Sequence, residues 1–269
     1  MSVVKDIHSW SKNLRKKLLV LGIPYFAFSL ATWILKILFS SSVNTEIGGL
    51  GDTLFFHPTS PYWYLYALFF LFLITPTFRN RSMAVGGIIA ALSFKTLEIF
   101  GGGYGIQAIS YILSNEIWFV IGMCLSVFEF KKHWAKRGFS VPIAVGMMFL
   151  LLSIWVYRTG IKHGIISFLL GLSACCSVVM IIEKIYENGQ QSPVFGILAK
   201  YTMPVFLMHT LFAAPLRTVL FKIGIQNAAI HVLLGIAISF IGPMIAAVII
   251  EKSRWLEFFL YPGKVIKMK

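Results

Sequence analysis

The sequence has few charged residues, and acidic residues are the rarer kind. Of its 269 residues, 13% are charged and 58% are hydrophobic, and the mean hydropathy is +0.80. Soluble domains are closer to half apolar and about a quarter charged. A soluble fold of this length would therefore lack the polar surface that covers a core. The composition excludes an ordinary soluble protein and indicates a chain solvated by lipid.

The scarcity of acids and cysteines also excludes several kinds of site. The two aspartates, Asp6 and Asp52, are far apart in the sequence, so the paired aspartates of a metal-dependent glycosyltransferase are missing. Neither H-E-x-x-H nor a P-loop occurs, and no His has an Asp five positions later. The cysteines, Cys124, Cys175 and Cys176, lie in apolar runs without zinc or disulfide spacing. We expect no bound metal and no bound cofactor.

Long apolar runs are abundant, and eight of them are close to the ~20 residues that cross a bilayer as a helix. They cover residues 18–39, 61–78, 83–100, 114–130, 139–157, 164–182, 197–221 and 230–250. The chain is therefore predicted to be an all-α, polytopic transmembrane bundle of about eight spans. Residues 18–250 form its membrane domain, after a basic interfacial helix over 1–17 and before a basic cytoplasmic tail over 251–269.

The positive charge is distributed unevenly between alternate loops. The net charge is +14, and if residues 1–17 are inside, 17 of the 24 Lys and Arg residues fall in inner segments and three in outer ones. Positively charged loops stay in the cytoplasm, so both termini are predicted to be cytoplasmic. Because these charges lie in short loops and not on a face with stacking aromatics, we expect no nucleic-acid partner.

One histidine falls near the centre of a predicted span. His209 lies within 197–221, and Thr202, seven residues earlier, shares its helical face. An ionisable group at that depth is costly and marks a functional candidate, and His transfers protons near neutral pH. A neutral His that hydrogen-bonds between helices is the alternative. We take His209 as a candidate catalytic residue and Thr202 as a candidate substrate contact.

Other candidates are less distinctive. Lys95 and Glu98 are spaced i,i+3, which fits either a neutralised pair near the outer interface or the polar lining of a substrate cavity. Trp63 stands in an aromatic cluster that opens the second span, as in an interfacial belt or a substrate contact. His57, in the first outer loop, is a second candidate catalytic residue, although an exposed loop histidine is often incidental.

Four stretches together resemble the acyltransferase-3 family of membrane O-acyltransferases. Residues 13–26 resemble that family's basic run before a Pro-Tyr helix, and residues 61–69 resemble its Trp-Phe-Leu helix start. Residues 115–123 are similar to its Phe-x-x-Gly helix, and residues 201–209 to its Tyr-Leu-x-His helix. Order and spacing agree over nearly the whole chain.

The resemblance implies an enzyme that moves an acyl group, acetyl in the simplest case, from cytosolic acyl-CoA to a hydroxyl of a cell-envelope or exported glycan. It implies that acyl-CoA and the glycan are partners, with the lipid bilayer, and that the protein lies in the plasma (inner) membrane of a bacterium. Four basic residues of one inner loop could attract the phosphates of CoA: Lys131, Lys132, Lys136 and Arg137.

One feature of the family has no counterpart. Its first helix carries an Arg followed by a catalytic His eleven positions later, and no Arg here has such a His. The match begins at what resembles the third family helix, so we expect the chain to lack the first two and to be weak or inactive alone. A transporter of a small solute or glycan and an inactive remnant of the enzyme are the alternatives, although no internal repeat typical of transporters is evident.

The predicted topology can be tested by cysteine labelling with a membrane-impermeant reagent. In a variant without native cysteines, Ser42→Cys is expected to react from outside, and Arg137→Cys only after the cells are opened, because basic loops remain inside. Labelling of position 137 from outside, with position 42 protected, would overturn the orientation.

Overall fold

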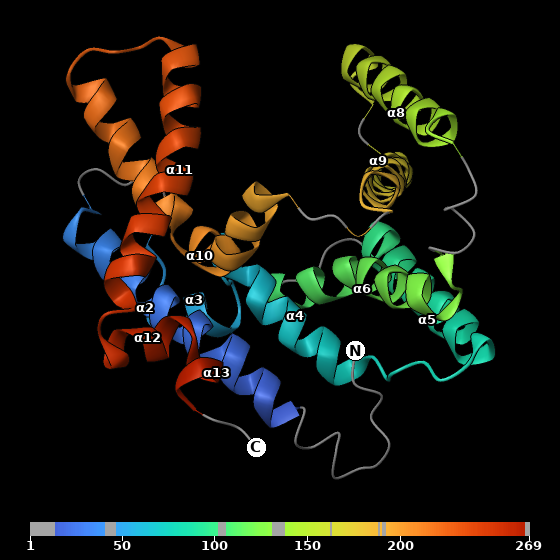
Figure 1. The fold of residues 1–269 in the computed structure, drawn as a ribbon, viewed down its shortest axis with the longest axis horizontal. Helices are drawn as coiled ribbons and strands as arrows, with labels where there is room; N and C mark the ends of the chain where they lie inside the picture. The colour runs from blue at the N-terminus through green and yellow to red at the C-terminus, as the bar shows by residue number, and fades with distance from the viewer. Residues whose placement is uncertain are drawn as a thin grey trace. The chain divides into compact units, whose positions relative to one another are not determined.

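The computed structural model describes residues 14–40, 47–101, 106–130, 138–161, 163–187, 189 and 192–266, and every regular element among them is a helix (Figure 1). The predicted all-α class is confirmed. In chain order the elements are η1 (Leu18–Gly22), α2 (Ile23–Leu38), α3 (Leu50–Phe55), α4 (Trp63–Ile74), α5 (Arg81–Phe100), α6 (Gln107–Val127), α8 (Ser140–Thr159), α9 (Gly164–Ile185), α10 (Pro193–Lys222), α11 (Ala228–Ile250), α12 (Arg254–Leu260) and α13 (Pro262–Val265).

Seven helices in the described residues are long and apolar enough to cross a membrane. The first is a continuous helix over Leu14–Leu38, which contains η1 and α2, and the others are α5, α6, α8, α9, α10 and α11. They match seven of the eight predicted spans. The stretch predicted over 83–100 is a 20-residue helix, although it carries two charged side chains. Many large apolar side chains on these helices are exposed, as expected where lipid is the solvent.

The remaining predicted span, 61–78, is helical only over the 12 residues of α4. At 1.5 Å per residue this helix is roughly 18 Å long, short of the ~30 Å hydrocarbon core. It ends where Thr75 becomes extended, with a ψ of 114°, because Pro76 disfavours a helical conformation in the residue before it. The first turn of α4 lies beside Thr32 and not at the outer end of α2, because the hydroxyls of Thr32 and Tyr62 are 2.8 Å apart.

Residues 47–60 run back along α2 and do not form the plain outer loop predicted from the sequence. The indole N–H of Trp33 donates to the carbonyl of Gly48 at 3.0 Å, and the hydroxyl of Tyr25 donates to the carbonyl of Leu54 at 2.6 Å. Tyr25 lies near the middle of the 25-residue helix Leu14–Leu38. The segment that carries α3 therefore folds back along α2, and we call it re-entrant in this sense.

The chain divides into two compact units. The first comprises Met1–Pro76, Tyr104–Ile112 and Val194–Lys269, and its core includes the fully buried side chains of Tyr62, Leu207 and Leu260. The second comprises Thr77–Gly103 and Leu113–Pro193. Its core is built mainly from α5 and α6, with Ile117 and Val120 almost fully buried.

The segment after α11 is structured in part, although the sequence predicted a basic tail over 251–269. Helices α12 and α13 pack against α2 and η1, and Lys264 pairs with Glu251 at 3.5 Å and with Glu257 at 3.9 Å. Burial, and next the charge of Glu251, raises the pKa of Tyr261 to about 12. At the other terminus, residues 1–13 of the predicted interfacial helix lie outside the described residues.

In the first unit, α11 approaches α10 closely at Gly242. The 30-residue helix α10 contains Pro204 and Pro215, which remove backbone donors, and Figure 1 shows its two ends running in different directions. On α11, Gly242 faces the ring of Phe212, and a β-carbon there would come within 2.6 Å of ring atoms. The absence of a side chain at Gly242 therefore permits this approach.

We predict that Gly242→Ala destabilises the protein by about 1–3 kcal/mol, because the Phe212 ring must move to accommodate a methyl group. Gly235→Ala in the same helix is the matched control, since no atom lies within 4 Å of its β-carbon position. Thermal unfolding in detergent measures both. Equal melting temperatures for the two variants would contradict the packing described.

Candidate functional site

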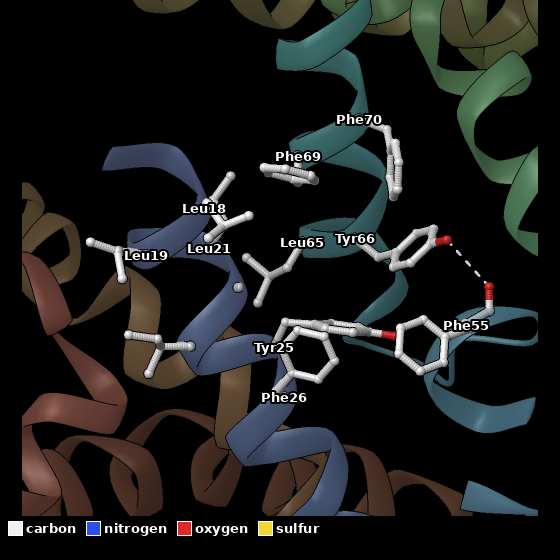
Figure 2. Close-up of a pocket in the computed structure, with 12 residues that line it drawn as sticks. Leu18, Leu19, Leu21, Tyr25, Phe26, Phe55, Leu65, Tyr66, Phe69 and Phe70 are labelled. Carbon is white, nitrogen blue, oxygen red and sulfur yellow. Dashed lines mark hydrogen bonds between the residues drawn. The ribbon is translucent and has the colours of Figure 1, made fainter. Parts of the chain in front are cut away.

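Two tyrosines from different helices hold the end of the re-entrant helix α3. Tyr25 of α2 donates its hydroxyl proton to the Leu54 carbonyl at 2.6 Å. Tyr66 of α4 donates to the next carbonyl, that of Phe55, at 3.2 Å (Figure 2). The last carbonyls of a helix have no partner within the helix, and leaving them unpaired in an apolar setting is costly. These bonds therefore fix where α3 ends.

A third carbonyl is held by the start of α6. The backbone N–H of Ala108 donates to the Phe56 carbonyl at 3.0 Å. Nearby, the ring of Trp63 stacks on that of Tyr111 with centroids 4.6 Å apart. One face of Trp63, predicted to contact substrate, is therefore covered by Tyr111. Three consecutive carbonyls, from Leu54 to Phe56, thus accept bonds from three different helices.

The side chains of His57 and Asp52 form a pair at the end of α3. The Nδ1 atom of His57 lies 2.7 Å from Oδ1 of Asp52, and the backbone N–H of His57 donates to the Asp52 carbonyl at 2.8 Å. A carboxylate only accepts hydrogen bonds, so Nδ1 carries the proton and Nε2 presents a lone pair. Both side chains are about half exposed, at 46% and 48%. This arrangement suits a general base whose orientation is held by an acid.

A small polar cavity adjoins Asp52. Its volume is about 20 Å³, which is room for about one water or one hydroxyl. A β-carbon on Gly48 would lie 3.3 Å from Oδ2 of Asp52, so the carboxylate sits directly against this glycine. The cavity is lined by Thr32, Trp33, Lys36, Ile47, Gly48, Thr53 and Thr59. It offers several hydroxyls and one positive charge beside the His–Asp pair.

A buried hydroxyl relay links this cavity to α10. The Tyr62 hydroxyl, fully buried, lies 2.8 Å from that of Thr32 and donates to the Leu207 carbonyl at 3.1 Å. Tyr62 therefore ties α2 and α10 together at the start of α4. The sequence indicated only an aromatic belt for this position.

His209 lies in a different place, on a groove of about 430 Å³ between α10 and α11. Its Nδ1 is within 3.0 Å of the Val205 carbonyl and 2.9 Å of the Phe206 carbonyl, so Nδ1 carries the proton. Thr202 lines the same groove, as its spacing predicted, but its hydroxyl donates to the Leu198 carbonyl at 2.8 Å. The structure shows no hydrogen bond between Thr202 and His209.

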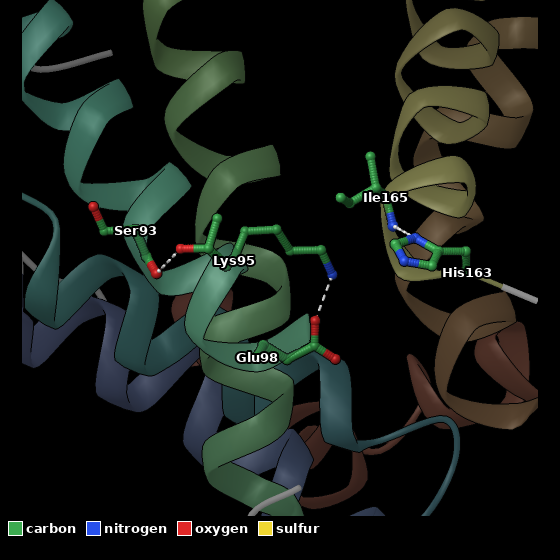
Figure 3. Close-up of polar contacts among 6 residues, drawn as sticks. Ser93, Lys95, Glu98, His163 and Ile165 are labelled. Atoms are coloured by element: carbon green, nitrogen blue, oxygen red, sulfur yellow. Dashed lines mark hydrogen bonds and ion pairs between the residues drawn. The ribbon is translucent and has the colours of Figure 1, made fainter. Parts of the chain in front are cut away.

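The remaining predicted site residues lie in the second unit or outside the described residues. Lys95 and Glu98 form an ion pair of 2.8 Å on α5, in the second unit (Figure 3). This pairing fits both interpretations of the sequence, a neutralised pair and the polar lining of a cavity. The four basic residues predicted to attract CoA lie outside the described residues; they are Lys131, Lys132, Lys136 and Arg137.

Comparison with known families decides the class of the protein. A family model described as an acyltransferase domain, that of the acyltransferase-3 family, matches residues 5–250. The chain belongs to the acyltransferase-3 family. No curated protein and no solved structure matched it. Membership in the acyltransferase-3 family and seven apolar helices identify an integral membrane protein of the acyltransferase class.

We predict that Tyr25→Phe destabilises this acyltransferase-3 protein by about 1–3 kcal/mol, because it leaves the partly buried Leu54 carbonyl without its donor. Amide exchange should rise most in residues 50–57, since α3 loses an anchor there. Tyr64→Phe is the matched control: Tyr64 is on the same helix as Tyr66, is 45% exposed and has no hydroxyl contact of this kind among the described residues. Identical exchange in the two variants would refute the anchoring role.

Proposed function

We propose that this protein transfers an acyl group from cytosolic acyl-CoA to a hydroxyl of a cell-envelope or exported glycan, at a site formed by His57 and Asp52. The observation that carries the proposal is the 2.7 Å bond between these side chains, on a segment that folds back along α2 as far as Tyr25. Membership of the acyltransferase-3 family supplies the reaction class. The sequence alone favoured His209; the geometry supports His57 better, because only His57 has a carboxylate partner among the described residues.

The pair can perform both proton transfers that acyl transfer requires. Nε2 of His57 takes the proton of the acceptor hydroxyl as its oxygen bonds to the thioester carbonyl carbon. When the C–S bond breaks, the imidazolium returns that proton to the departing CoA thiolate. Asp52 holds the imidazole in one tautomer and stabilises its charged form. Lys36, in the adjoining cavity, supplies positive charge for the oxygen that becomes negative in between.

The membrane setting also supports this assignment. A His–Asp pair beside a membrane helix is expensive, and residues of this kind mark functional sites. We place the protein in the plasma membrane of a bacterium, with acyl-CoA approaching from the cytoplasm, where basic residues such as Lys131 and Arg137 would attract its phosphates. Acetyl-CoA is the simplest donor of this class.

A second candidate function is transport of a small solute or glycan. Transporters place substrates near the midplane beside broken helices, and both the re-entrant α3 and the proline-containing α10 fit that description. Purified protein in vesicles distinguishes the two: transport moves an unchanged solute across the membrane, whereas transfer leaves acyl groups covalently bound to the glycan.

We predict that His57→Gln lowers acyl transfer by ~10²–10⁴-fold, because Gln can hydrogen-bond to Asp52 but cannot take up a proton. Asp52→Asn should lower the rate as well, because an amide can hydrogen-bond Nδ1 in the wrong tautomer and cannot stabilise the imidazolium. The measurement is transfer of radiolabelled acyl groups from acyl-CoA to envelope glycan in membranes that contain equal amounts of each variant.

Two further variants serve as a control and as a test of the alternative base. His163→Gln, at the start of α9 in the second unit, is the matched control for a histidine change. His209→Gln tests the site favoured by the sequence. Loss of transfer in His209→Gln, with full activity in His57→Gln, would transfer the base assignment to His209. Full activity in both variants would refute both assignments.

A further inference from the structure

An apolar cavity leads from the inner part of the first helix to the end of α3. Its volume is about 290 Å³, near the lower end of the range for small-molecule sites. Figure 2 shows side chains from η1, α2, α3 and α4 around it. Leu18 and Gly22 lie at one end, Phe55 at the other, and Leu65 and Phe69 along one wall. Phe55, at this end of the cavity, is two residues before His57, although neither His57 nor Asp52 lines the cavity.

We propose that this cavity holds the alkyl chain of the acyl group, with its carbonyl end at His57 and its tail toward Gly22. The proposal rests on the acyltransferase function proposed above and specifies its donor: a fatty acyl thioester longer than acetyl. The depth of the cavity then sets the chain length that the enzyme accepts.

The lining of the cavity excludes polar occupants. Its side-chain polar groups are the hydroxyls of Tyr25 and Tyr66, and both already donate to the carbonyls of Leu54 and Phe55. A sugar or a pantetheine amide would find no free donor here, and burying such groups without hydrogen bonds is unfavourable. An alkyl chain requires no hydrogen bonds, and its transfer from water into the cavity is favourable. The cavity is therefore suited to the apolar part of a donor.

Gly22 keeps the far end of the cavity open. It is the last residue of η1, a π-helical turn, and such turns inside α-helices are frequent at functional sites. No atom lies within 4 Å of the position that a β-carbon on Gly22 would occupy. A larger side chain there therefore fits without displacing the helix and fills the space available to the chain.

Chain-length selectivity tests the proposal directly. Wild-type membranes are expected to transfer octanoyl groups from octanoyl-CoA at least about tenfold more efficiently, in kcat/KM, than acetyl groups from acetyl-CoA. Gly22→Leu should lower the octanoyl-to-acetyl ratio by about tenfold or more and retain acetyl transfer. Gly235→Leu on α11 is the matched control, because its β-carbon position is equally open and lies outside the cavity. An unchanged ratio in Gly22→Leu would overturn the proposal.

A binding measurement separates this inference from the proposed reaction. Octanoyl-CoA with a photoreactive diazirine at the end of its chain is irradiated with the purified protein, and labelled peptides are identified by mass spectrometry. Labelling concentrated in residues 18–26 and 65–70, and reduced in Gly22→Leu, supports the cavity even if no acyl transfer is detected. Labelling spread evenly over the lipid-facing helices α8 and α9 indicates partition into lipid alone and overturns it.

Discussion

Three hydrogen bonds to consecutive carbonyls at the end of α3 position the His57–Asp52 pair and one end of the apolar cavity. Helix α3 has only six residues and could not hold its place through its own backbone bonds. The donors come from Tyr25, Tyr66 and Ala108, on three different helices. Because an apolar environment penalises unpaired carbonyls, these donors select one position for the segment. That position brings Asp52 and His57 toward the middle of α2 and closes one end of the apolar cavity.

The fold could be predicted from the sequence wherever a long apolar run determines it. Lipid solvates the outside of such helices, so length and hydropathy suffice for seven of them. The prediction failed over 61–78 because two local effects oppose the apolar pattern. Pro76 ends α4 early, and α4 begins beside Thr32 and not at the outer end of α2. Neither effect is visible in the mean hydropathy of the predicted span.

The site was predictable only in part. His57 could be named from its type, but its partner could not, because the known His–Asp signature has the Asp after the His and here Asp52 precedes His57. The spacing of five residues from Asp52 to His57 becomes meaningful only when a helix ends between them. Tyr62 and Tyr66 fit an interfacial belt equally well by composition. Their roles as hydrogen-bond donors depend on partners 145 and 11 residues away, which no local pattern reveals.

The central claim is that α3 enters the membrane and carries the His–Asp pair to its middle. Spin labels at three exposed positions measure depth through their relative accessibility to oxygen and to a water-soluble nickel complex: Phe56 beside the pair, Leu30 near the middle of α2, and Phe39 at its outer end. We predict that the label at position 56, in protein reconstituted into bilayers, has a depth close to that at position 30. A depth at position 56 equal to that at position 39 would place the pair at the surface and contradict the account.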